Sequence, residues 1–289
     1  MTGGCAAVGN DIASCQSRGV KVLLSIGGGM GNYSLASATD AQALASYLWV
    51  YFLGGAAVLD GIDFAIKDGS SGHYDDLVKN LASQYDTEDA RRRTYVLAAA
   101  PRWEYPDAAL GAALATGLFD QVWVQFYNDP TCEYWPGDVA KLRSVWEQWA
   151  RSLPSRTALL LGLPASSDFV ASGYIAPHHL ASEVLPVLGR ANNHSGIMLW
   201  SRYQDMYTGY STIVTRDVAS TSIADPPTAA PPTSSPTGPS QKRRIKIYIV
   251  AGSSALVGIG VILLVFFLWY KTHYGMLPWQ RGVKDYIKD

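Results

Sequence analysis

The residues with the clearest chemical potential lie in one short run, Asp60-Gly-Ile-Asp-Phe-Ala-Ile-Lys67. Alternate side chains of a strand point to the same face, so Asp63, Ala65 and Lys67 are expected to share one surface. Two carboxylates on such a surface could act as a general acid and a general base. Here one carboxylate shares the surface with a lysine, whose reference pKa of about 10.4 makes it a poor proton donor near neutral pH. We expect Lys67 and Asp63 to form a partly buried ion pair instead.

Other predicted strands also end in residues that could contact a ligand. Their ends carry Ser25-Ile-Gly-Gly-Gly29, Ala99-Ala-Pro-Arg102, Gln125-Phe-Tyr-Asn128, Gly162-Leu-Pro-Ala165 and Leu199-Trp-Ser201. The parallel strands of a barrel bring such ends to one mouth, where ligands bind. Trp200 offers an aromatic face that suits the C–H edges of a sugar, or it fills the core. Tyr127 is likewise either a ligand contact or a packed barrel residue.

The elements that must position these residues are six apolar runs alternating with amphipathic stretches, the pattern of parallel βα units. The predicted strands are residues 20–26, 61–66, 95–100, 121–126, 158–163 and 197–200. The predicted helices include residues 40–52, 74–84, 138–150 and 177–189. This alternation, without a glycine-rich dinucleotide motif, favours an α/β barrel over a doubly wound sheet.

The strand-end motifs, in this order, resemble glycoside hydrolase family 18, and within it the plant class III chitinases of the hevamine type, over roughly residues 5–218. The resemblance implies a (β/α)8 TIM barrel whose first two strands would precede residue 20 and are missing from this sequence. In the family motif D-x-x-D-x-D-x-E, the final Glu protonates the glycosidic oxygen. The Asp two residues earlier stabilises the intermediate that the substrate's own N-acetyl group forms. Lys67 and Ala65 occupy these two positions, so the resemblance implies that no catalytic set is intact, although Asp63 is retained.

The resemblance also implies that part of a sugar site survives. Tyr127 matches the tyrosine that assists the N-acetyl group, Trp200 matches the floor of the sugar subsite, and Gln125 and Asn128 are candidate contacts beside them. The expected function is a catalytically inactive chitinase-like domain that binds a chitin-type oligosaccharide or a protein partner, in a receptor-like or defence role. Two alternatives stay open: an anchored endochitinase that uses an unrecognised acid, and an inhibitor of other glycosidases.

The C-terminal quarter of the chain differs in composition from the predicted barrel, residues 1–219. Residues 220–241 are rich in Pro, Ser and Thr and are expected to form an extended stalk. Residues 247–270 are uncharged and apolar over a length that predicts a single transmembrane helix, followed by a short tail, residues 271–289. We therefore predict a single-pass plasma-membrane protein in contact with the lipid bilayer. Basic residues flank the span on both sides, so charge alone does not fix its orientation.

Other sequence features bear on an extracellular barrel. Asn32 and Asn193 lie in sequons and are candidate glycosylation sites. Small residues four apart in the predicted span, Ala251 and Ala255, are compatible with weak dimerisation. The first residues lack the charged and apolar regions of a signal peptide, so none is predicted within this sequence.

Composition narrows the partners and cofactors. A net charge of -1 without a basic cluster argues against nucleic acid. Three scattered cysteines are too few for a zinc site, and neither a metal nor another cofactor is expected. The resemblance implies that partners for Cys5 and Cys15 would lie in the missing segment. It also implies that Cys132 has lost its partner, because Trp103 stands in that position.

Overall fold

The computed structural model describes residues 8–28, 33–54, 59–67, 71–86, 95–191, 193–221 and 246–250. The strands are β1 (Leu23–Gly27), β2 (Gly61–Ala65), β3 (Val96–Ala99), β4 (Gln121–Gln125), β5 (Ala158–Pro164), β6 (His194–Trp200) and β7 (Lys246–Val250). They form one sheet in chain order, and each strand pairs in parallel with the next. A doubly wound sheet reverses its strand order at a switch point, whereas this order is unbroken. The predicted α/β fold with barrel-type winding is therefore confirmed for the described residues.

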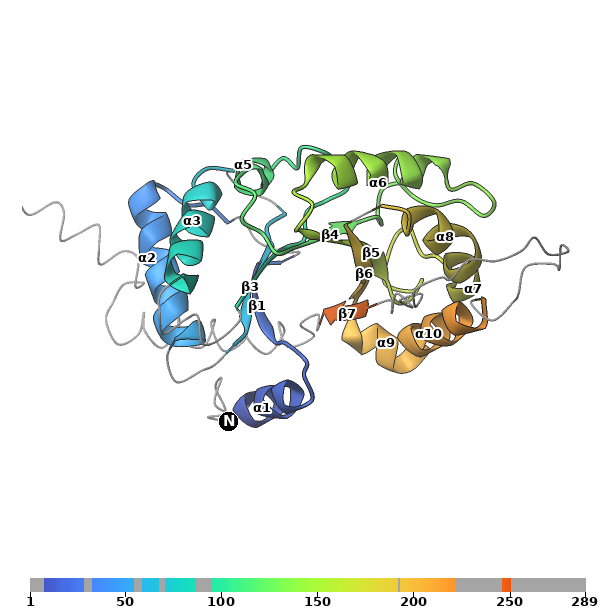
Figure 1. Cartoon of the computed structure of the whole chain (residues 1–289), viewed down its shortest axis with the longest axis horizontal. Helices are drawn as coiled ribbons and strands as arrows, with labels where there is room; N and C mark the ends of the chain where they lie inside the picture. The colour runs from blue at the N-terminus through green and yellow to red at the C-terminus, as the bar shows by residue number, and fades with distance from the viewer. Residues whose placement is uncertain are drawn as a thin grey trace, which may run out of the picture. The chain divides into compact units, whose positions relative to one another are not determined.

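Helices follow most of the strands, and Figure 1 shows α2, α3, α5 and α6 flanking the sheet. The helical segments are α1 (Gly9–Ser17), α2 (Ala38–Leu48), η2 (Trp49–Leu53), α3 (Tyr74–Tyr85), α5 (Gly111–Ala115), α6 (Ala140–Ser152), α7 (Pro177–His179), η3 (Leu180–Val184), α8 (Leu185–Leu188), α9 (Arg202–Thr208) and α10 (Tyr210–Thr221). Local sequence explains their ends and faces. The Ser37 hydroxyl caps α2 by accepting a hydrogen bond from the Asp40 amide at 3.1 Å. Along α6, Leu142, Trp146 and Trp149 are buried at helical spacing.

The strands bury two separate apolar layers, because alternate side chains point to opposite faces. Ile62 and Phe64 belong to the larger core, which also contains the helix residues. Trp123, Leu160 and Met198 form a second cluster, against which Ala65 packs. Asp63 and Ala65 therefore share the inner face of the sheet, as the strand alternation predicted.

The seventh strand was not predicted, and it overlaps the first residues of the predicted membrane span. Lys246–Val250 pairs with β6 from Gly196 to Trp200, so residues 247–250 form part of a strand rather than the start of a helix. Two causes favour this: the Lys-Ile-Tyr-Ile-Val sequence has high β propensity, and an edge strand such as β6 offers unpaired backbone groups. Residues 251–270 lie outside the described part of the chain. Among the described helices, none is long and apolar enough to cross a membrane.

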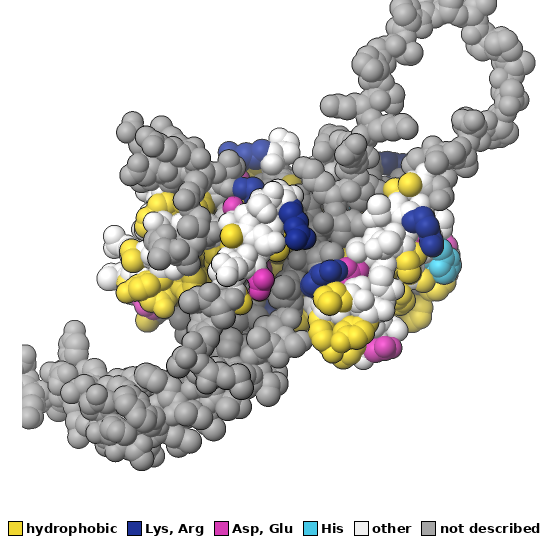
Figure 2. All heavy atoms as spheres, turned by 90° about the horizontal axis from the view of Figure 1, so that it is seen from below, with side chains coloured by type: hydrophobic (Ala, Val, Ile, Leu, Met, Phe, Trp, Pro, Cys, Tyr) yellow, Lys and Arg dark blue, Asp and Glu magenta, His cyan; other side chains and the backbone are white. Residues whose placement is uncertain are grey.

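Several large apolar side chains remain exposed, and Figure 2 shows hydrophobic side chains at the surface toward the left and the right of the face in view. Tyr47 and Tyr51 are exposed on α2 and η2, and Met206 and Tyr207 are exposed on α9. Exposure of an aromatic ring therefore does not by itself mark a ligand site here. A site must be argued from position and from neighbouring polar groups.

Candidate functional site

Asp63 is a buried carboxylate in the middle of β2. Asp63 is 3% exposed. Its Oδ2 atom accepts a hydrogen bond from the Ser25 hydroxyl of β1 at 2.7 Å. The other oxygen, Oδ1, has no hydrogen-bond partner among the described residues. Burial raises the pKa of Asp63 to about 6, while the Ser25 hydrogen bond and the positive charge of Lys67 partly oppose the rise. Asp63 therefore takes up a proton more readily near neutral pH than an ordinary aspartate does.

Lys67 is bound elsewhere than predicted. Its ammonium group donates a hydrogen bond to the carbonyl oxygen of Ala100, at the end of β3, and Gln125 Nε2 donates to the same oxygen at 3.5 Å. The predicted contact with Asp63 is replaced by attraction at longer range. Residues four apart along an extended strand are about 13 Å apart, so the backbone itself separates the two side chains. Lys67, just after β2, and Gln125, at the end of β4, therefore both bind the carbonyl oxygen of Ala100, just after β3.

Tyr127 completes this group of residues. It follows β4 directly, and burial raises the pKa of its hydroxyl above the ordinary value, with the charge of Asp63 adding to the rise. Tyr127 therefore stays protonated and keeps an O–H donor at neutral pH. The structure brings Asp63, Lys67, Gln125 and Tyr127 to one end of the sheet.

Asn128, a predicted ligand contact, is used to hold a loop. Its backbone is left-handed, with φ of 63°, and its side-chain oxygen accepts a hydrogen bond from the Ala171 amide at 2.8 Å. Its own amide donates to the Ser172 carbonyl at 3.2 Å. Beside it, Gly173 lies so close that a Cβ atom there would meet Tyr127 Cα at 2.5 Å. Asn128 therefore positions the loop against Tyr127, and its contact with a ligand stays a prediction.

Glu133 is a functional candidate that sequence reasoning missed. It is 3% exposed, and Oε1 accepts hydrogen bonds from the Asp129 amide at 2.8 Å and from the Ser172 hydroxyl at 2.7 Å. Glu133 therefore stabilises the same loop as Asn128, because it binds Ser172 and Asn128 binds Ala171. Local sequence does not indicate this role, because the Ser172 partner of Glu133 lies 39 residues away.

Trp200 stands at the carboxyl end of β6 and is 36% exposed, so it is not a buried core residue. Its carbonyl accepts a hydrogen bond from the Ala165 amide at 2.8 Å, just beyond β5, and its backbone pairs with Val250 of β7. Backbone pairing on both sides holds the indole at the mouth of the barrel. An aromatic face there suits stacking on a sugar.

The remaining predicted sites fall outside this mouth. Asn193 is 7% exposed and its side-chain amide donates to the Ala150 carbonyl at 3.3 Å, and its glycosylation stays a prediction. Asn32 lies outside the described residues. Cys132 is buried without a disulfide partner among the described residues, and burial raises the pKa of its thiol to about 12. Cys15 is exposed and free.

The raised pKa of Asp63 predicts a specific pH dependence of stability. Because its pKa is higher in the folded state, at about 6, than the ordinary value of 3.8, the folded state holds the proton more tightly. The free energy of unfolding should then fall as pH rises from about 4 to about 6. Asp63→Asn cannot titrate, so its stability relative to the unmodified chain should rise by about 2 to 3 kcal/mol between pH 4 and pH 7.

Urea unfolding of both proteins at intervals between pH 4 and pH 7 measures this difference. Asp11→Asn, at an exposed position in the first turn of α1, is the matched control and should show a flat difference. A flat difference for Asp63→Asn as well would contradict the assignment of a raised pKa to this buried carboxyl.

Comparison with known proteins adds to this geometry. Residues 7–171 match the family model described as glycosyl hydrolases family 18. An acidic endochitinase from Vitis vinifera is 48% identical over 223 residues, which cover 74% of this chain and 73% of that protein. The crystal structure of the ICChI chitinase from Ipomoea carnea has 42% identity and a TM-score of 0.68, covering 74% of this chain and 79% of the other. A xylanase-α-amylase inhibitor protein, XAIP-I, solved in complex with trehalose, has 40% identity and a TM-score of 0.67, covering 72% and 79%.

Proposed function

The chain belongs to the glycosyl hydrolases family 18, and we propose that it is a saccharide-binding member of this family that does not hydrolyse its ligand. One observation carries the proposal. The position expected to hold the proton donor holds Lys67, whose ammonium is bound to the Ala100 carbonyl, and Ala65 replaces the assisting acid.

Lys67 opposes hydrolysis in two ways. A lysine ammonium with a pKa near 10.4 donates a proton poorly at neutral pH, and loss of a general acid typically forfeits about 10²- to 10⁴-fold in rate. Its positive charge also disfavours the cationic transition state of glycoside cleavage. The methyl group of Ala65 supplies no compensating negative charge.

Asp63 is the nearest replacement acid, and its pKa of about 6 would suit proton donation. Its position does not. It lies two residues before Ala65, about 7 Å deeper along the strand, and is buried with one oxygen bound to Ser25. A glycosidic oxygen at the mouth would be out of its reach.

Ligand binding draws on different residues. Trp200 offers an exposed aromatic face, and Tyr127 and Gln125 supply hydrogen-bond donors from the end of β4. The proposed ligand is a chitin-type oligosaccharide, because the Vitis vinifera relative named above is an acidic endochitinase. Calorimetric titration of the full chain with the N-acetylglucosamine tetramer tests this. We expect saturable one-to-one binding and intact tetramer afterwards, whereas absence of binding would refute the proposal.

A second candidate function is inhibition of other glycosidases. The similarity to XAIP-I, named as a xylanase and α-amylase inhibitor, favours it. Assays of a xylanase and an α-amylase with and without the full chain separate this candidate from saccharide binding. Inhibition that persists in a Trp200→Ala variant would assign it to a surface other than the mouth.

We also propose that the chain is anchored in the plasma membrane with the barrel outside the cell. Residues 251–270 comprise 20 uncharged residues, the number that a helix needs to cross a bilayer of about 30 Å. A span that begins after Val250 would leave the pairing of β7 with β6 intact. The anchor and the seventh strand therefore need not compete for the same residues.

Membrane fractionation tests the anchor. The full chain should stay in the membrane pellet after alkaline carbonate extraction, and a chain that ends at Val250 should move to the soluble fraction. The matched control is the full-length variant Leu263→Arg with Leu264→Arg, since each charge at mid-span opposes insertion by about 2.5 to 3.5 kcal/mol. Release of the unmodified chain by carbonate would contradict the proposal.

A further inference from the structure

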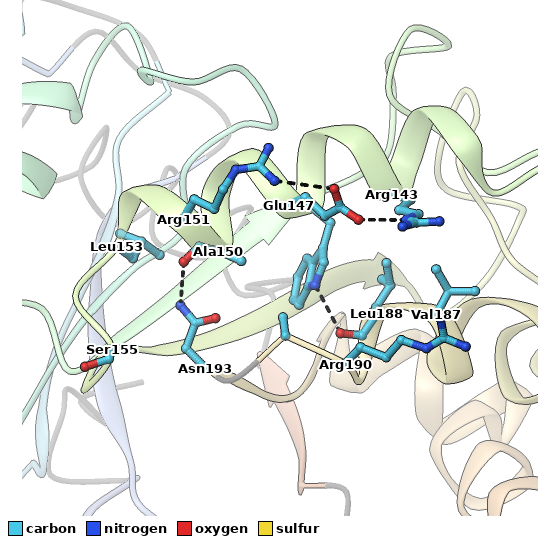
Figure 3. Close-up of a pocket in the computed structure, with 12 residues that line it drawn as sticks. Arg143, Glu147, Ala150, Arg151, Leu153, Ser155, Val187, Leu188, Arg190 and Asn193 are labelled. Carbon is cyan, nitrogen blue, oxygen red and sulfur yellow. Dashed lines mark hydrogen bonds and ion pairs between the residues drawn. The ribbon is translucent and has the colours of Figure 1, made fainter.

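A hollow of about 410 Å³ lies between α6 and the segment that leads from α8 to β6 (Figure 3). Leu153 and Ser155 line it shortly before β5 begins, and Asn193 lines it immediately before β6 begins. The hollow is therefore at the amino ends of these strands. Asp63 and Trp200 mark the opposite end of the sheet, so the hollow is separate from the proposed saccharide site.

The floor of this hollow is apolar and its polar groups are already used. Trp146 and Leu188 are each 1% exposed, and the Trp146 indole N–H donates to the Leu188 carbonyl at 3.3 Å. Asn193 donates to the Ala150 carbonyl in the same way. Figure 3 shows both hydrogen bonds running within the floor. Above this buried floor, the partly exposed side chains of Ala150, Val187 and Ala191 offer a ligand apolar contact.

The rim of the hollow is positively charged on both walls. On α6, Glu147 pairs with Arg143 at 2.7 Å and with Arg151 at 3.4 Å, and the Arg143 hydrogen bond is the main cause that lowers the pKa of Glu147. Arg190 extends from the opposite wall and makes no ion pair within the described part of the chain. One carboxylate shared by two arginines, with a third arginine facing them, leaves the rim with a net positive charge.

We propose that this hollow binds an acidic peptide segment of a partner protein. One large apolar side chain of the segment lies against the partly exposed side chains of Ala150, Val187 and Ala191, and flanking carboxylates pair with Arg190 and with the arginines of α6. An exposed Arg–Glu ladder along a helix contributes little to stability by itself. The ion pairs on α6 do not account for the positions of Arg190 and of the apolar side chains that line the same hollow. Arginine is one of the residue types enriched in binding hot spots.

Fluorescence anisotropy with the full chain and a labelled Glu-Asp-Phe-Asp-Glu peptide tests the proposal. Arg190→Glu should weaken binding about tenfold or more, and added salt should weaken binding to the unmodified chain. Lys141→Glu, at an exposed position on α6 that does not line the hollow, is the matched control. It should change the affinity by less than about twofold.

Four results would overturn the proposal. The first is equal binding of a peptide with glycine in place of phenylalanine, and the second is equal binding of a peptide with lysines in place of the acids. The third is an equal effect of the Arg190 and Lys141 variants. The fourth is displacement of the peptide by inorganic phosphate at equal concentration, which would identify a site for a bare anion. Binding that survives Trp200→Ala would support the separation of the hollow from the mouth.

Discussion

Lys67→Glu combined with Ala65→Asp is expected to give the chain measurable hydrolysis of N-acetylglucosamine oligomers, at a rate about 10²- to 10⁴-fold above that of the unmodified chain. The new glutamate would replace an ammonium group at the mouth. The new aspartate would stand between it and Asp63 on the same face of β2. Like charges at this spacing raise the pKa of the outermost carboxyl, which is the condition for a proton donor at neutral pH.

The gain in hydrolysis rate is measured by using chromatography to follow the release of shorter oligomers. Lys67→Gln is the matched control, because it removes the positive charge without supplying an acid and should stay near background. Lys67→Glu alone should fall between the two, since the cationic intermediate still lacks its carboxylate. A double variant that binds the tetramer normally and remains at background would show that the two substitutions do not account for the missing activity.

Trp200→Ala should weaken binding of the tetramer about tenfold or more, because it removes the exposed aromatic face that ends β6. Trp200→Phe should lose only part of the affinity. Tyr51→Ala is the control, since Tyr51 is 59% exposed on η2, an element that carries none of the proposed contacts. Calorimetry reports all three affinities. Equal losses for the Trp200 and Tyr51 variants would contradict a sugar platform at Trp200.

Most strands could be predicted from the sequence because short apolar runs mark them locally. The six predicted runs coincide with β1 to β6, and their ends differ by a few residues. β7 was missed because a short apolar run that continues into a longer one has no feature that separates a strand from a helix. Its identity as a strand depends on pairing with Gly196–Trp200, which lies about fifty residues earlier in the chain.

The roles of individual polar side chains were harder to predict, since their partners are distant in sequence. Lys67 was expected to reach Asp63 four residues away, and instead its hydrogen bond crosses to Ala100, 33 residues on. Asn128 and Asn193 each bond to a residue 43 positions away. Strand alternation fixed which side chains face the barrel interior, but only the folded chain determines which polar group each of them meets.

The measurement that most directly tests the central claim is product analysis of the unmodified full chain with the N-acetylglucosamine hexamer. Ligand at saturating concentration is incubated with the chain over hours at pH 5 and pH 7, and the oligomers are separated by chromatography. The account predicts that the hexamer binds and is recovered intact at both pH values, because neither Lys67 nor Asp63 can deliver a proton to its glycosidic oxygens. Appearance of shorter oligomers above a buffer control would contradict it.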